Sequence, residues 1–189
     1  MKVTKSLILA LVLLVLVSAL YRAFPNRPMG FAPQYAMAIF GGAIFRKNMK
    51  WAFALPLLSM FLSDVIYQLL YVRGLSATPG FYAGQWQNYL LVSSLTFIGL
   101  FIKKINVPSV LTASIAAPTA YFILSNFIVW IGGGGLHRPK TWSGLMQCYN
   151  DALPFYPNSL YATVLFSTIL FCGFYLVKNL MGDTSKQIA

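Results

Sequence analysis

Six runs of apolar residues divide the chain, with short polar connections between them. The runs cover residues 6–23, 33–45, 51–72, 86–102, 108–131 and 159–180. A helix needs about 20 apolar residues to cross the roughly 30 Å hydrocarbon core of a membrane, and fewer where neighbouring helices cover one end. The pattern therefore predicts an all-α membrane protein, a six-transmembrane-helix bundle in which residues 1–189 form a single integral membrane domain.

The second run is the shortest and is rich in small residues. Ala32 and Ala36, and then Ala38 and Gly42, are spaced four positions apart, a spacing that lets helix backbones approach closely. We expect this run to pack inside the bundle.

The composition agrees with a membrane protein and limits the kinds of partner. Hydrophobic residues make up 58% of the chain and charged residues 9%, which is typical of an integral membrane protein and leaves no soluble catalytic domain. The net charge of +11 would suit nucleic acid, but the cations lie in short segments between apolar runs and not on one basic face. We therefore expect the lipid bilayer as a partner and no nucleic acid.

The distribution of Lys and Arg predicts the orientation of the six spans. One side, which includes both termini, carries nine cations: Lys2, Lys5, Arg46, Lys47, Lys50, Lys103, Lys104, Lys178 and Lys186. The opposite side carries five: Arg22, Arg27, Arg73, Arg138 and Lys140. Because cytoplasmic loops carry the excess of Lys and Arg, both termini are expected in the cytoplasm.

The first run has a second interpretation. Lys2 and Lys5 precede an apolar stretch that ends in Val17-Ser18-Ala19, an arrangement that resembles a secretory signal with a small-residue cleavage site. The run is therefore either a retained helix or a cleaved signal.

Asp64 is the only acidic residue inside an apolar run, and an intramembrane carboxylate normally faces a partner or a cavity. It ends the string Pro56 to Ser63-Asp64, and a related string from Pro118 to Ser125-Asn126 follows 62 positions later. We expect both polar pairs to lie at a similar depth near the outer face. They line a ligand cavity, or alternatively Asp64 and Asn126 hydrogen-bond each other and only hold the bundle together.

The outer connections carry most of the aromatic and polar residues. Trp130, Trp142, Tyr149 and Phe155 lie in or near the connection 132–158, and the connection 73–85 leads to a further set: Tyr82, Trp86, Gln87 and Tyr89. Such residues suit a flat, amphipathic small molecule, but Trp and Tyr also gather at membrane interfaces without binding anything.

Metal binding and catalysis have little support in the sequence. His137 and Cys148 are eleven positions apart and could supply two ligands, whereas a structural zinc site needs four. No glutamate, HExxH, GxSxG or Walker motif is present. We expect no cofactor and no enzymatic activity.

Four blocks of sequence resemble a bacterial family of small multi-span proteins of unknown function that are assigned to transport and are similar to S components of energy-coupling-factor (ECF) transporters. The blocks are Phe31-Ala-Pro33 with Ala36 to Gly42, Pro56 to Asp64, Phe122 to Trp130, and Gly144 to Phe155. The resemblance covers about residues 25–175. It implies a multi-pass protein of the bacterial inner membrane that binds a small substrate, together with a transmembrane coupling subunit and ATPases as partners.

The leading hypothesis is capture of a small, vitamin-like molecule from the outer face. Asp64, Asn126, Ser63 and Ser125 would line the site, and the aromatic set Trp130, Trp142, Tyr149 and Phe155 would cover the ligand. One alternative is a proton- or ion-coupled secondary carrier that uses Asp64. Another is a non-transporting assembly protein whose small-residue second span packs against a partner.

Overall fold

The chain folds into seven α-helices and one short 3-10 helix within the residues that the computed structural model describes. It describes the backbone of residues 5–24 and 27–187 and the side chains of residues 11–24 and 27–177. The elements are α1 (Lys5–Arg22), α2 (Gln34–Ile44), α3 (Met49–Val72), α4 (Gln85–Leu100), α5 (Val107–Ile131), α6 (Trp142–Ala152), η1 (Leu153–Phe155) and α7 (Tyr156–Gln187). No strand occurs in these ranges, so the all-α prediction is confirmed.

Six of the helices coincide with the six apolar runs, and most of their ends agree within three residues. Three helical segments are long and apolar enough to cross a membrane: Met49–Val72, Val107–Ile131 and Trp142–Val177. The described part of α1, Leu11–Arg22, and α2 are apolar but shorter. The fold therefore fits a membrane protein.

Helix α6 is the element that the sequence pattern did not predict. It lies in the connection 132–158, where no continuous apolar run marks a helix. Its N-terminus is capped by Thr141, whose side chain accepts a hydrogen bond from the Gly144 backbone N–H at 3.2 Å. Only one face of this helix is apolar, so a search for continuous apolar runs cannot detect it.

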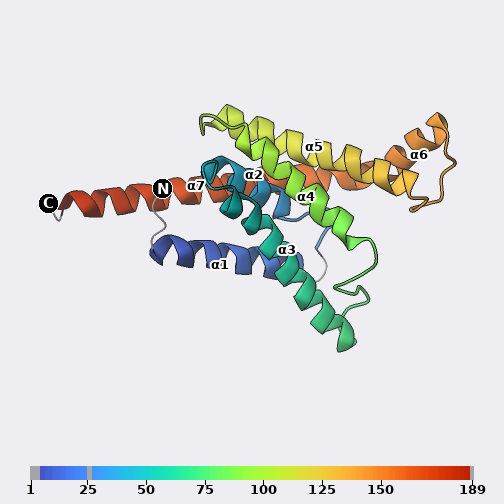
Figure 1. Cartoon of the computed structure of the whole chain (residues 1–189), viewed down its shortest axis with the longest axis horizontal. Coiled ribbons are helices and arrows are strands. Elements are labelled where there is room, and N and C mark those ends of the chain that lie inside the picture. Colours follow the sequence, from blue (N-terminus) through green and yellow to red (C-terminus); the bar gives the residue numbers. More distant parts are fainter. Residues whose placement is uncertain (1–4, 25–26, 188–189) are drawn as a thin grey trace.

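Helices α1, α5 and α7 run roughly along one long axis, and α3 and α4 cross it obliquely (Figure 1). The start of α1 and the end of α7 lie at one end, here called the terminal end. Helix α6 lies at the opposite end, here called the α6 end. At the terminal end the Arg46 guanidinium donates a hydrogen bond to the Ile102 carbonyl at 3.4 Å, which joins the connections 45–48 and 101–106.

Helix α2 occupies the centre of the bundle and contacts α3, α4, α5 and α7. A Cβ atom on Gly42 would lie 2.3 Å from the Thr96 carbonyl oxygen of α4, and one on Gly41 would lie 2.5 Å from the Ala52 carbonyl oxygen of α3. Only glycine permits such close backbone contact. The prediction that this short span packs inside the bundle is confirmed.

Candidate functional site

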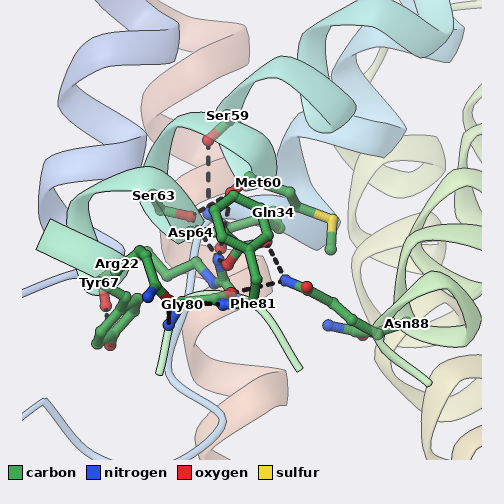
Figure 2. A network of polar contacts seen from close by, with 12 residues as sticks. Arg22, Gln34, Ser59, Met60, Ser63, Asp64, Tyr67, Gly80, Phe81 and Asn88 are labelled. Atoms are coloured by element: carbon green, nitrogen blue, oxygen red, sulfur yellow. Dashed lines mark hydrogen bonds and ion pairs between the residues drawn. The ribbon is translucent and has the colours of Figure 1, made fainter. Parts of the chain in front are cut away.

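A buried ion pair between Arg22 and Asp64 forms the centre of a polar network towards the α6 end (Figure 2). The Asp64 side chain is 3% exposed and the Arg22 side chain 17% exposed. One carboxylate oxygen of Asp64 pairs with Arg22, and the other accepts hydrogen bonds from Gln85 Nε2 at 2.6 Å and from Tyr89 Oη at 2.5 Å. Three donors on two helices, α1 and α4, therefore satisfy this carboxylate, as a buried charge requires.

Arg22 is the last residue of α1, and the network fixes this helix end against α3. Its guanidinium also donates to Ser63 Oγ and, at 3.4 Å, to the Met60 carbonyl. The Tyr67 hydroxyl in turn donates to the Arg22 carbonyl at 2.7 Å, with the guanidinium 5.8 Å from the centre of the Tyr67 ring. The carbonyl of a helix terminus, which has no partner inside its own helix, is thus satisfied.

The connection 73–84 folds back over Asp64 because a glycine permits it. A Cβ atom on Gly80 would lie 1.9 Å from the Asp64 carbonyl oxygen, so a larger residue there would push the connection away. The Gly80 carbonyl accepts from Gln85 Nε2 at 2.9 Å, and the Gly80 N–H donates to Gln68 Oε1 at 3.1 Å. These contacts place Gln85, the first residue of α4, against the carboxylate.

Gln34 lies beside this network, at the start of α2. Its Nε2 donates to Ser59 Oγ at 3.4 Å, while its Oε1 is buried and has no hydrogen-bond partner among the described atoms. Ser59 precedes Ser63 by one helical turn on α3, and Figure 2 shows Gln34, Ser59 and Asp64 grouped together. The buried amide oxygen of Gln34 is therefore an open acceptor next to a satisfied ion pair.

Aromatic and amide side chains follow Gln34 towards α5. The rings of Tyr35 and Tyr121 are 4.6 Å apart, and the Tyr121 hydroxyl donates to Asn88 Oδ1 at 2.6 Å. Helices α2, α4 and α5 thus contribute one aromatic pair and one amide to this region.

The direct hydrogen bond between Asp64 and Asn126, the alternative to a shared ligand cavity, does not form. The Asn126 amide donates to the Phe122 carbonyl of its own helix at 2.7 Å, and Ser125 Oγ donates to the same carbonyl at 3.4 Å. Helices α3 and α5 both pack against α2 and α4 but not extensively against each other, so their polar pairs do not meet. The hypothesis that Asp64 and Asn126 hydrogen-bond each other is wrong.

The predicted aromatic cover lies on α5, α6 and η1 and partly fixes these elements to one another. The Trp130 indole N–H donates to the Pro139 carbonyl at 2.9 Å, and the Tyr149 hydroxyl donates to the Ile123 carbonyl at 3.0 Å. Trp142 and Phe155 are 76% and 45% exposed. The structure thus brings Ser63 together with Asp64, and gathers the other predicted residues in a separate group.

The two weak metal candidates have other contacts. The Cys148 thiol, which is buried, donates to the Asn126 carbonyl at 3.6 Å, and the exposed His137 ring lies with Nδ1 2.6 Å from the Gly133 carbonyl oxygen. Within the described ranges, no group of three His, Cys, Asp or Glu residues could hold a metal ion.

A second ion pair, between Arg138 and Asp151, joins the connection 132–141 to α6. The Arg138 guanidinium donates two hydrogen bonds of 2.8 Å to the Asp151 carboxylate. These hydrogen bonds hold the pKa of Asp151 below its usual value. Both side chains are about one-third exposed, so the pair is a surface contact.

Arg22, Gln34 and Gln85 were not predicted as parts of the network, although Tyr89 was included in the aromatic set. A signal for Arg22 was present, since it ends the first span on the same side of the membrane on which Asp64 was placed. Opposite charges at one depth of a bundle are expected to pair. No comparable signal exists for the other two residues, because Gln85 was assigned to the connection 73–85 and Gln34, near the start of the run 33–45, carries no charge that demands a partner.

Comparison with known proteins gives a family but no activity. No match was found among curated proteins, and none among solved structures. Neither comparison therefore names a transport protein or an S component. The model of the Family of unknown function (DUF6580) matches residues 2–185, nearly the whole chain, and the protein therefore belongs to this family.

Proposed function

We propose that this protein captures a small molecule at the α6 end of a six-span bundle in the bacterial inner membrane, in the manner of an ECF S component. The coincidence of six helices with six apolar runs supports the six-span topology. The excess of Lys and Arg at the terminal end supports cytoplasmic termini, so that the α6 end faces outward.

The observation that carries the proposal is the open acceptor on Gln34. This residue is 3% exposed and its Oε1 has no partner among the described atoms. A buried amide oxygen without a hydrogen bond costs about 1–3 kcal/mol. A ligand that donates an N–H or O–H to it recovers that free energy, and this gain favours the bound state.

The neighbouring residues suggest what kind of ligand fits. The Tyr35 and Tyr121 rings offer aromatic surface, and Asn88 offers an amide. A flat molecule with a hydrogen-bond donor on one edge suits such a wall, as a vitamin-like compound would. Because the Arg22–Asp64 pair is internally neutral, it does not demand a charged ligand.

The Arg22–Asp64 pair fixes α1, α3 and α4 beneath this ligand. In the proposed site, Ser59 of α3 contacts Gln34, and Ser63 and Asp64 follow on the same helix. Contact of the ligand with the α5 and α6 residues stays a prediction that concerns the following set: Ser125, Asn126, Trp130, Trp142, Tyr149 and Phe155.

Ligand-induced stabilisation tests the proposal directly. The full chain in lipid nanodiscs would be heated with a panel of vitamins and vitamin-like metal complexes, each at up to millimolar concentration. A ligand at 100 times its Kd stabilises the folded state by about 2.7 kcal/mol, a rise in Tm of roughly 5–11 °C for a chain of this length. If no compound in the panel raises the Tm of the wild-type protein, capture of this ligand class is refuted.

A matched pair of variants then locates the site. Gln34→Leu removes the amide with little change of volume, so the Tm rise is expected to disappear. Gln87→Leu makes the same change at an exposed position of α4 and is expected to keep the full rise. Equal ligand shifts in both variants would place the site elsewhere.

The carrier alternative has one observation in its favour. Asp64 is a buried carboxylate inside an apolar helix and accepts a hydrogen bond from Tyr89. A carrier that protonates Asp64 during its cycle would lose pH dependence in Asp64→Asn. Uptake by that variant with unchanged pH dependence would exclude it.

The alternative of an assembly protein was based on a small-residue face of α2 that would pack against a partner protein. The small residues of α2 contact α3 and α4 of the same chain, so they present no surface to a partner. Co-purification from the native membrane separates the hypotheses further: a coupling subunit with ATPases favours the S-component-like function, and a different stable partner favours assembly.

A further inference from the structure

An open groove of about 650 Å³ lies between α4 and α5 at the terminal end, far along the bundle from the network around Asp64. It begins at the connection 101–106 and extends along the first turns of α5. The lining residues used below are Lys103, Lys104, Ser109, Thr112, Ala113 and Ala116.

The groove has a polar mouth and apolar walls. Lys103 and Lys104 are exposed at the mouth, and the hydroxyl-bearing residues Ser109 and Thr112 follow on α5. Phe101 belongs to the connection at the mouth, and deeper along the two helices the walls consist of apolar residues: Ile98, Ala113 and Ala116. This order of cationic, hydroxyl and apolar groups matches that of an anionic phospholipid from headgroup to acyl chain.

The length of the groove agrees with one leaflet. The segment from Asn106 to Ala116 rises by about 15 Å at 1.5 Å per residue. The hydrocarbon core is roughly 30 Å thick, so a leaflet contributes about half of it. A lipid whose phosphate lies at Lys103 and Lys104 therefore places its acyl chains along this part of α5.

The charge at the mouth is not neutralised by the described acidic residues. Asp64 and Asp151, the two carboxylates with described side chains, pair with Arg22 and Arg138 at the other end of the molecule. Arg46 approaches the same connection through its hydrogen bond to the Ile102 carbonyl. Basic pockets between transmembrane helices are a known setting for anionic headgroups.

We propose that this groove binds one anionic phospholipid of the leaflet at the terminal end. The phosphate pairs with Lys103 and Lys104, the Ser109 and Thr112 hydroxyls donate to headgroup or ester oxygens, and the chains cover Ala113 and Ala116. This inference requires a membrane location but not the proposed small-molecule function.

Native mass spectrometry of the full chain in detergent tests the headgroup half. The protein is titrated with dioleoylphosphatidylglycerol and, separately, with dioleoylphosphatidylcholine, and the apparent Kd of the first bound lipid is measured. Two Lys residues near a lipid surface together change the affinity for an anionic lipid by roughly thirtyfold. We expect the double variant K103Q/K104Q to lose about that factor for phosphatidylglycerol and little for phosphatidylcholine.

A matched double variant separates a site from general attraction. K47Q/K50Q removes the same charge at the same end, from exposed positions outside the groove. We expect it to lose at least tenfold less affinity than K103Q/K104Q. Equal losses in the two double variants, or equal wild-type affinity for the two lipids, would overturn the proposal in favour of diffuse attraction.

The predicted position of the acyl chains is tested by variants that retain both Lys103 and Lys104. Ala116→Trp fills the apolar part of the groove, and the first lipid is expected to bind at least tenfold more weakly. Ile115→Trp adds the same ring at an exposed position of α5 outside the groove and is expected to leave binding unchanged. Undiminished binding by the Ala116 variant would show that the lipid does not lie in the groove.

Discussion

Breaking the Arg22–Asp64 pair is expected to destabilise the protein strongly, and by different amounts depending on which of the two residues is replaced. In Arg22→Gln the carboxylate stays buried, with only the Gln85 and Tyr89 hydrogen bonds to stabilise its charge. In Asp64→Asn the remaining guanidinium belongs to a side chain that is 17% exposed and can reach water. Removing the arginine should therefore cost more than removing the aspartate.

The magnitude follows from the burial of the pair. Removing one partner of a buried ion pair typically costs about 3–5 kcal/mol. We place Arg22→Gln near the upper value and Asp64→Asn near the lower one. For a chain of this length these changes correspond to a fall in Tm of roughly 6–20 °C.

A double-mutant cycle in nanodiscs measures this coupling. The free energy of unfolding is compared for the wild type, both single variants and the double variant. The double variant should be more stable than the sum of the two losses implies, by about 0.5–3 kcal/mol. Additive losses would show that the two side chains do not interact, and a more harmful Asp64→Asn would refute the argument from exposure.

Two further perturbations address packing and acid stability. Gly42→Ala places a methyl group 2.3 Å from the Thr96 carbonyl oxygen, so it should lower the unfolding free energy by about 1–3 kcal/mol. In the control Gly173→Ala, the added methyl group meets no described atom within 4 Å, so the unfolding free energy should not fall. An unfolding free energy of Gly42→Ala equal to that of the wild type would contradict the close packing. Because the folded pKa of Asp151 is lowered by Arg138, this pair stabilises the 132–141 connection above the unfolded pKa of about 3.9 and loses that effect as the pH falls through the folded pKa. Hydrogen exchange of the connection, corrected for its intrinsic pH dependence, should rise on acidification in the wild type, whereas Asp151→Asn should show no such step.

The helices were predictable because most of the apolar runs are long and end at charged or turn-forming residues. Residues 51–72 and 108–131, for example, became α3 and α5 with changes of two residues or fewer. Helix α6 escaped because its apolar residues occupy one face only. Its existence depends on tertiary contacts, such as the hydrogen bond from Tyr149 to the Ile123 carbonyl.

The centre of the site was predictable only in part. The depth of Asp64 and the cost of a buried charge correctly indicated a partner, but the repeated string led to Asn126. Helix rotation decides which side chains meet, and the matching strings on α3 and α5 carry no information about it. Arg22 is the partner of Asp64 because α1 packs against α3 and because a guanidinium neutralises a carboxylate, which an amide cannot.

The glycine contacts of α2 also restrict how the bundle can move. Gly41 of α2 lies against the α3 backbone, and Gly42 of α2 and Gly99 of α4 lie where these two helices meet. Sliding α2 along either neighbour would therefore bring main-chain atoms into collision. Helices α2, α3 and α4 should therefore move as one rigid body. Any opening that admits or releases a ligand must then come from the helices outside this body: α1, α5, α6 and α7.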